Sequence, residues 1–258
     1  AATAKADRIL NEIEEMVAKN CTAVDIAYTP ADLSRLKKAG KKAVMLGIEN
    51  GYAIGKDITN VERFRHRGVV YMTLCHNGNN DICGSARYNE EELGVSTFGE
   101  QVIKEMNRVG MMVDISHAGE KSFYDALAIS GKPIVASHSS ARALCDHPRN
   151  LTDDQLKALA AKGGVAQVCM YGGFLRKNGE ATIKDAIEHL NHMVNVMGIE
   201  HVGIGTDFDG DGGITGCASA SELINFTRRL LLERYSEENI RLIWGGNFLR
   251  VMEEVQRK

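Results

Sequence analysis

The stretch HVGIGTDFDGDGG, residues 201–213, decides how the chain is interpreted, because it is compatible with two different structures. From Asp207 onward it has the order D-x-D-x-D-G, with which a calcium-binding EF-hand loop begins. Such a loop needs a bidentate glutamate at its twelfth position, where this chain has Ala218. It should also follow a helix, whereas HVGIG is too short and too rich in Gly and Val for one. The stretch is therefore interpreted as a buried strand that ends at Asp207.

The composition of the chain is that of an ordinary globular protein. It has 258 residues, of which 44% are hydrophobic and 25% are charged. The net charge of −3 gives no electrostatic reason to expect binding to nucleic acid. No apolar run approaches the roughly 18 residues of a membrane span, so no transmembrane segment is predicted. The six cysteines form no C-x-x-C pair, which argues against a zinc ribbon and favours buried thiols.

Short apolar runs recur along the chain and predict buried strands. The runs are AVMLGIE (43–49), GVVYMTLCH (68–76), GMMVDISH (110–117), KPIVASH (132–138), GGVAQVCM (163–170) and HVGIGTD (201–207). Most carry apolar residues at both odd and even positions. This pattern is typical of parallel strands that are covered on both faces.

Helical patterns separate these runs. Their starts are marked by capping signals at Thr29-Pro30, at Thr97 with Glu100 and at Thr152 with Gln155. Further helices are predicted at 2–19, 182–197, 219–233 and 236–244, and from 247 to the end of the chain. Strands that alternate with helices predict a parallel sheet, either doubly wound or closed into a (β/α)8 barrel. A dinucleotide-binding fold is disfavoured because GIGTDFDGDGG does not fit G-x-G-x-x-G before a helix.

Polar residues at the strand ends favour the barrel. Five of the six runs end on a residue that can bind a metal or transfer a proton, namely Glu49, His76, His117, His138 and Asp207. In a barrel the carboxyl ends of the strands form one rim, where active sites are built. Imidazole and carboxylate groups that converge there suit a divalent transition metal, most simply zinc. The carboxylate at the end of the last strand is then predicted to be an acid-base group.

The remaining histidines are assigned no role. His66 lies in a basic run and is expected to be solvated. His147 is expected in a loop, and His201 precedes a predicted strand. His189 and His192 share one face of the predicted helix 182–197. Their spacing could hold a surface metal, but a solvated helix face is the preferred interpretation.

Seven motifs resemble those of the membrane dipeptidase (renal dipeptidase) family of zinc peptidases. They are GIENG, LCHNGNN, MVDISH, SHSSAR, HPRNLTDDQL, GIGTDFDG and GGNFLRV, in this order, and they cover nearly the whole chain. The resemblance implies a (β/α)8 metallohydrolase barrel and hydrolysis of dipeptides, often with a D residue on the C-terminal side. It also implies a dipeptide substrate as the partner and a homodimer.

The resemblance also implies a role for each strand-end residue. Glu49 matches the carboxylate that bridges two zinc ions in the family, and His117 and His138 match the histidines of the second zinc. His76 matches a histidine that contacts the substrate and the developing oxyanion.

Two further positions match residues that handle the substrate. Arg149 matches the arginine that pairs with the C-terminal carboxylate of the dipeptide, a planar group that suits arginine. Asp207 matches the acid-base aspartate.

One feature of the family is missing from this chain. The family has an H-x-D motif on its first strand, which supplies ligands of the first zinc, and no H-x-D occurs here. The strand count agrees, since six strands are predicted where a closed barrel has eight. Residues 1–258 are therefore expected to form a single (β/α) barrel domain that lacks its first two strands, either as a fragment or completed by another chain. Glu49, His117 and His138 still predict one zinc.

Three functions are compatible with these residues. The preferred one is a zinc-dependent dipeptidase. The first alternative is a truncated, non-catalytic member of the same family that binds a ligand or a partner. The second is a barrel metallohydrolase that acts on another amide or ester, against which Arg149 argues, because it favours a substrate with a free carboxylate.

Overall fold

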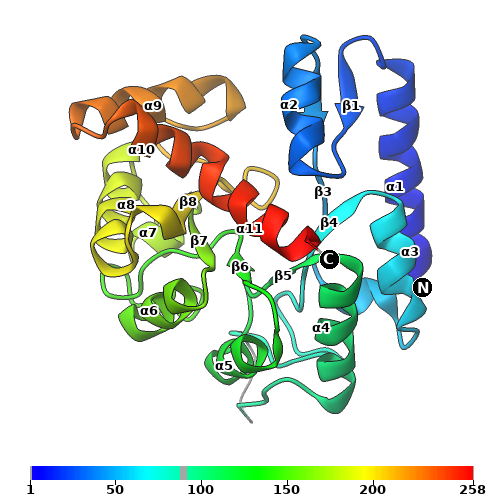
Figure 1. Ribbon diagram of the computed structural model, residues 1–258. Coiled ribbons are helices and arrows are strands. Elements are labelled where there is room, and N and C mark those ends of the chain that lie inside the picture. The colour runs from blue at the N-terminus through cyan, green and yellow to red at the C-terminus, as the bar shows by residue number, and fades with distance from the viewer. Residues whose placement is uncertain (1, 88–91, 258) are drawn as a thin grey trace. The chain divides into compact units, whose positions relative to one another are not determined.

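The chain has an α/β fold built on parallel strands (Figure 1). In the computed structural model, residues 2–87 and 92–257 are described. They divide into two compact units, 1–133 with 252–258 and 134–251. All six strands that were expected in the barrel are present, three in each unit. Within the described ranges, no helix is both long and apolar enough to cross a membrane.

The first unit begins with two helix–strand pairs that precede its main strands. Helix α1 (Ala2–Lys19) leads to strand β1 (Val24–Ile26), and helix α2 (Pro30–Lys38) leads to strand β2 (Lys42–Val44). Strands β1 and β2 pair in parallel as a separate two-stranded sheet. Helix α2 starts as predicted, because Thr29 and Asp32 form a reciprocal capping box and Pro30 occupies the first turn.

The main strands of the first unit are β3 (Leu46–Ile48), β4 (Val69–Thr73) and β5 (Met112–Asp114), which pair in parallel in chain order. Between them lie a 3-10 turn, η1 (Gly51–Ile54), and helices α3 (Thr59–His66) and α4 (Thr97–Val109), and α5 (Glu120–Ile129) follows β5. Helices α3 and α4 lie side by side (Figure 1). Strand β4 is buried at four of its five positions, as expected for a parallel strand covered on both faces.

The second unit contains strands β6 (Val135–Ala136), β7 (Val165–Cys169) and β8 (Val202–Gly205), again parallel and in chain order. Helices α6 (Asp153–Ala161) and α8 (Ile183–Met197) pack side by side (Figure 1), and a short helix, α7 (Gly172–Leu175), follows β7. A 3-10 turn, η2 (Ile199–His201), precedes β8. The elements after β8 are η3 (Ala220–Glu222), α9 (Leu223–Leu232), α10 (Glu237–Arg241) and α11 (Asn247–Gln256).

Three details of the elements differ from the predictions. The run 43–49 is not one strand but two, β2 and β3, which belong to different sheets. Helix α4 is capped by Ser96, whose hydroxyl accepts from the Gly99 N–H, and Thr97 is its first residue. The helix expected at 236–244 ends at Arg241, where a π-helical turn (Leu242–Gly246) follows.

Candidate functional site

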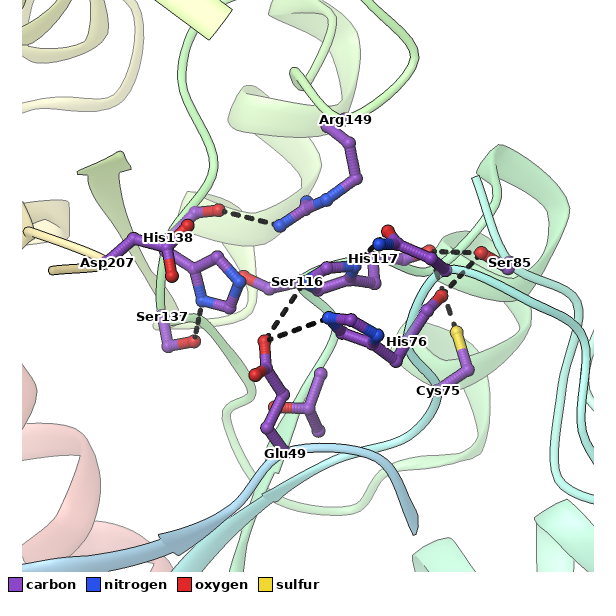
Figure 2. A network of polar contacts seen from close by, with 12 residues as sticks. Glu49, Cys75, His76, Ser85, Ser116, His117, Ser137, His138, Arg149 and Asp207 are labelled. Carbon is purple, nitrogen blue, oxygen red and sulfur yellow. Dashed lines mark hydrogen bonds and ion pairs between the residues drawn. The ribbon is translucent and has the colours of Figure 1, made fainter. Parts of the chain in front are cut away.

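In the first unit, three strand ends bring a carboxylate and two imidazoles together (Figure 2). Glu49 follows β3, His76 lies beyond β4 and His117 lies beyond β5. The Glu49 Oε1 is 3.0 Å from His117 Nε2 and 3.9 Å from His76 Nε2. One ligand atom from each of the three residues lies within 4.8 Å of the others. The two imidazole rings are 4.3 Å apart between centroids.

The backbone of His117 is held in an unusual conformation. Its φ is +71°, in the left-handed region that costs energy for a residue with a side chain. The surrounding loop fixes this conformation, because the His117 carbonyl accepts from the Ala86 N–H at 2.7 Å. The same carbonyl also accepts from the Ser85 hydroxyl and the Cys75 thiol. These bonds aim the imidazole at Glu49.

The hydrogen bond of the other ring nitrogen selects the tautomer of His117. The Nδ1 of His117 lies 3.2 Å from the side-chain oxygen of Asn77. An Nδ1–H donor matches that oxygen, and in this tautomer Nε2 is the ring nitrogen that would bind a metal ion held with Glu49. An imidazole in this state is ready to bind a metal through Nε2.

A buried aspartate fixes the strand ends below these groups. Asp114, the last residue of β5, accepts from the Thr73 hydroxyl at 2.7 Å, at the end of β4. It also accepts from the Ser116 N–H at 3.0 Å, which shapes the turn before His117. Asp114 is fully buried. It therefore ties two neighbouring strand ends together and limits the movement of the groups that they carry.

The three groups differ in their access to solvent. The side chain of His117 is 7% exposed, whereas those of His76 and Glu49 are 40% and 43% exposed. One side of the cluster is thus anchored in the protein and the other is open. An open coordination side is typical of catalytic metal sites, whereas structural sites are closed by protein ligands.

These donors fit a zinc ion. Two imidazole nitrogens and a carboxylate oxygen are ligands that zinc takes in catalytic sites. The cluster is also compact enough for all three side chains to hold one ion. His76, which was predicted to contact the substrate, thus lies in the same cluster as Glu49 and His117.

In the second unit, His138 and Arg149 lie together (Figure 2). His138 follows β6, and its Nδ1 is 2.7 Å from the Ser137 hydroxyl. The Arg149 guanidinium donates to the His138 carbonyl at 3.3 Å and lies over the Phe174 ring at 5.2 Å. Arg149 is only 3% exposed, so a cation is held in the protein interior.

The predicted strand 201–207 is shorter than expected: β8 ends at Gly205, and Asp207 lies two residues beyond it. Its φ is +56°, and its carbonyl accepts from the N–H groups of Gly210 and Gly212. A side chain at Gly212 would overlap the main-chain carbonyls of Thr206 and Asp207, so glycine is required there. One carboxylate oxygen, Oδ2, is 3.5 Å from the Cys169 sulfur. Asp207, Asn50 and His117 are all non-glycine residues with positive φ, and each is a strand-end residue or follows one.

The interpretation of His189 as a solvated residue is wrong. His189 is 1% exposed, its Nδ1 accepts from the Ala141 N–H, and its Nε2 donates to the Leu175 carbonyl. Burial lowers the pKa of His189 to about 4, so it is a neutral structural residue. His192, on the same helix, pairs with Asp153 at 2.7 Å.

The sequence of the chain matches a known protein family. The model of the membrane dipeptidase family, peptidase family M19, matches residues 2–258. The chain belongs to the membrane dipeptidase family. The resemblance inferred from the seven motifs is thereby confirmed.

Other members of the membrane dipeptidase family are similar to this chain in sequence. An uncharacterized dipeptidase of Schizosaccharomyces pombe is 38% identical over 232 residues, which are 87% of this chain and 56% of that protein. The chain spans about half the length of the curated relatives it matches.

Two solved structures confirm the predicted fold class. The probable dipeptidase PvdM of Pseudomonas aeruginosa superposes with a TM-score of 0.91 at 29% identity, covering 96% of this chain and 78% of that one. A metallopeptidase of Rhodobacter sphaeroides, liganded with a phosphinate mimic of L-Ala-D-Ala, superposes with a TM-score of 0.89 at 26% identity. That match covers 95% of this chain and 72% of the other.

Several residues of the dipeptidase-family site were not identified from the sequence. They orient other groups: Asn77, Asp114, Ser137 and Cys169. Asn77, Asp114 and Ser137 lie within three residues of a predicted histidine, so their place beside the motif was a usable signal. Cys169 gives no such signal, because its contact with Asp207 joins residues 38 positions apart.

Proposed function

We propose that the protein hydrolyses dipeptides with the help of a zinc ion. The observation that carries this proposal is the cluster of Glu49, His76 and His117 at three strand ends of a membrane dipeptidase family chain. Its two imidazoles and one carboxylate are typical ligands of catalytic zinc, and its open side leaves room for a substrate. When bound, zinc supplies a Lewis acid that lowers the pKa of water to about 7.

In the first unit, the residues of the chain hold and orient this centre. Glu49 and His117 are the proposed metal ligands, and His76 is close enough to serve as a third or to contact the substrate. Asn77 keeps the proton of His117 on Nδ1 and so leaves Nε2 to bind. Because His117 is nearly buried, its position is set before substrate arrives.

In the second unit, we propose that Arg149 binds the C-terminal carboxylate of the dipeptide. Its guanidinium is buried, fixed by the His138 carbonyl and stacked on Phe174, so it is preorganised for a planar anion. We propose that His138 also binds zinc, with Ser137 holding its Nδ1.

Asp207 is the proposed acid-base group. It takes a proton from the attacking water and gives one to the leaving amine, which matches the two proton transfers of peptide hydrolysis. A strained backbone conformation at such a residue is common, because the surrounding structure fixes the side chain where the reaction needs it.

The test is hydrolysis of L-Ala-D-Ala by the zinc-loaded wild type and by zinc-loaded Asp207→Asn. Hydrolysis is measured as the release of free amine. We expect turnover in the wild type, loss of turnover after treatment with a chelator, and recovery on adding zinc. Asp207→Asn should retain its metal and lose kcat by orders of magnitude. Zinc binding without hydrolysis in the wild type would contradict the proposal and favour a non-catalytic family member. Hydrolysis of esters or other amides but of no dipeptide would favour the other metallohydrolase hypothesis.

A further inference from the structure

The carboxylate of Asp207 has a neighbour that the proposed mechanism does not use. The thiol of Cys169, the last residue of β7, donates to Asp207 Oδ2 across 3.5 Å. Cys169 is fully buried. A hydrogen bond to an ionised acceptor is stronger than one between neutral groups, which offsets the weakness of the thiol as a donor.

The strand geometry explains why these two side chains meet. Cys169 is the register partner of Gly205 in the parallel pair of β7 and β8. Gly205 has no side chain, and a Cβ there would overlap the Ser137 carbonyl. The strand ends at Gly205, and the loop that follows, with Asp207 at a φ of +56°, brings the Asp207 carboxylate to the thiol. The strand partner of Cys169 therefore has no side chain, and the thiol has the Asp207 carboxylate as its hydrogen-bond acceptor.

The main chain at Cys169 is fixed on both sides. The Cys169 N–H donates to the Ser140 hydroxyl at 3.1 Å, and that hydroxyl is 3.2 Å from the Cys169 carbonyl. Ser140 is also fully buried. The thiol is therefore presented from a rigid strand end, whereas Asp207 lies in a loop of strained conformation.

The thiol keeps its proton under ordinary conditions. Burial, and then the negative charge of Asp207, raise the pKa of the Cys169 thiol well above its usual range. A thiolate beside the carboxylate would repel it, but the protonated thiol is a donor. The contact is hence a stable one-way hydrogen bond at neutral pH.

We propose that Cys169 is a positioning residue for Asp207. It binds Oδ2 and so turns Oδ1 toward the proton that is transferred, which makes the rate of the chemical step depend on a thiol that never touches the substrate. This inference rests on the proposed acid-base role of Asp207.

The first test compares kcat and KM for L-Ala-D-Ala in the zinc-loaded wild type, Cys169→Ala and Cys169→Ser. We expect Cys169→Ala to lower kcat about tenfold, the effect of losing one hydrogen bond to a charged group, with KM within about twofold. Cys169→Ser restores a donor and should recover part of kcat. Cys217→Ala, which removes another fully buried thiol of the same unit, is the matched control and should leave kcat unchanged.

A purely structural role for Cys169 predicts a different pattern. Cys169→Ala and Cys217→Ala would then lower the thermal stability and kcat alike, and Cys169→Ser, which buries a hydroxyl, would recover nothing. Either a kcat of Cys169→Ala equal to the wild type or the absence of recovery in Cys169→Ser would overturn the proposal.

A second test does not depend on turnover. The Raman S–H stretching band of Cys169, isolated as the difference between the wild type and Cys169→Ala, reports the strength of its hydrogen bond. In Asp207→Asn the acceptor becomes neutral, so the band should move to higher frequency. A band that does not move would overturn the proposal. A band that moves in a protein without hydrolysis would support the contact while refuting the proposed function, so the two failures are distinguishable.

Discussion

The hydrogen bond between Asn77 and His117 provides a sharp test of the metal centre. Asn77→Ala removes the acceptor that holds the proton on His117 Nδ1, 3.2 Å away. Without it, His117 can adopt the tautomer in which Nε2 carries the proton, and its ring can rotate. Zinc affinity should therefore fall, although the residue that binds the ion is unchanged.

The size of the effect follows from the geometry. Changes to partners of metal-binding histidines lower metal affinity about 10- to 100-fold. The bond here is single, between neutral groups and at the long end of the normal range, so the lower value applies. We expect the Kd for zinc to rise about tenfold, equivalent to about 1.4 kcal/mol.

Two further variants separate this effect from general damage to the loop. Asn77→Asp keeps an acceptor and adds a negative charge, so the affinity for zinc should equal or exceed that of the wild type. Asn79→Ala changes the same residue type in the same loop, but Asn79 accepts from the Ser85 N–H at 2.8 Å. It should lower stability more than zinc affinity.

The assay is a competition titration of zinc against a chromophoric chelator, with folding checked by circular dichroism. An unchanged Kd in Asn77→Ala would refute the proposed control of the tautomer. An equal loss of affinity in Asn77→Ala and Asn79→Ala would refute it too, because the loop rather than the hydrogen bond would then be responsible.

Two predictions concern the second unit and the stability of the fold. The folded-state pKa of His189 is about 4 and its ordinary value is 6.5, so the unfolded chain takes up a proton first as the pH falls. Between pH 7 and pH 4, the free energy of unfolding of the wild type should drop by up to about 3 kcal/mol more than that of His189→Gln, as measured by urea unfolding. Parallel plots of this free energy against pH for the two proteins would contradict the prediction. Gly205→Ala should destabilise the protein by about 1–3 kcal/mol, since its Cβ would overlap the Ser137 carbonyl, a main-chain atom that cannot rotate away. Gly131→Ala, whose Cβ meets only an atom at 3.7 Å, is the control in the same melting experiment, and equal Tm values for the two variants would refute the steric argument.

The strand ends could be predicted from the sequence because they combine two independent patterns. An apolar run predicts the strand, and a polar residue at its end predicts the rim. Glu49 and His117 meet as expected, 3.0 Å apart. The capping box of Thr152 and Gln155 also forms as predicted, because such caps depend on residues three apart.

The features that were missed depend on contacts distant in sequence. The division of 43–49 into β2 and β3 follows from pairing with β1 and β4, which no local pattern records. The burial of His189 depends on the loops of Ala141 and Leu175, which satisfy both ring nitrogens and so remove the cost of burying them.

The metal content of the protein shows whether the strand ends of the first unit hold zinc. Zinc per chain would be measured by elemental analysis after dialysis against metal-free buffer, in the wild type and in His117→Ala, with folding confirmed by circular dichroism. We predict that the wild type retains zinc and that folded His117→Ala retains at least one equivalent less. Equal zinc content in the two proteins, or a folded wild type that binds none from zinc-containing buffer, would contradict it.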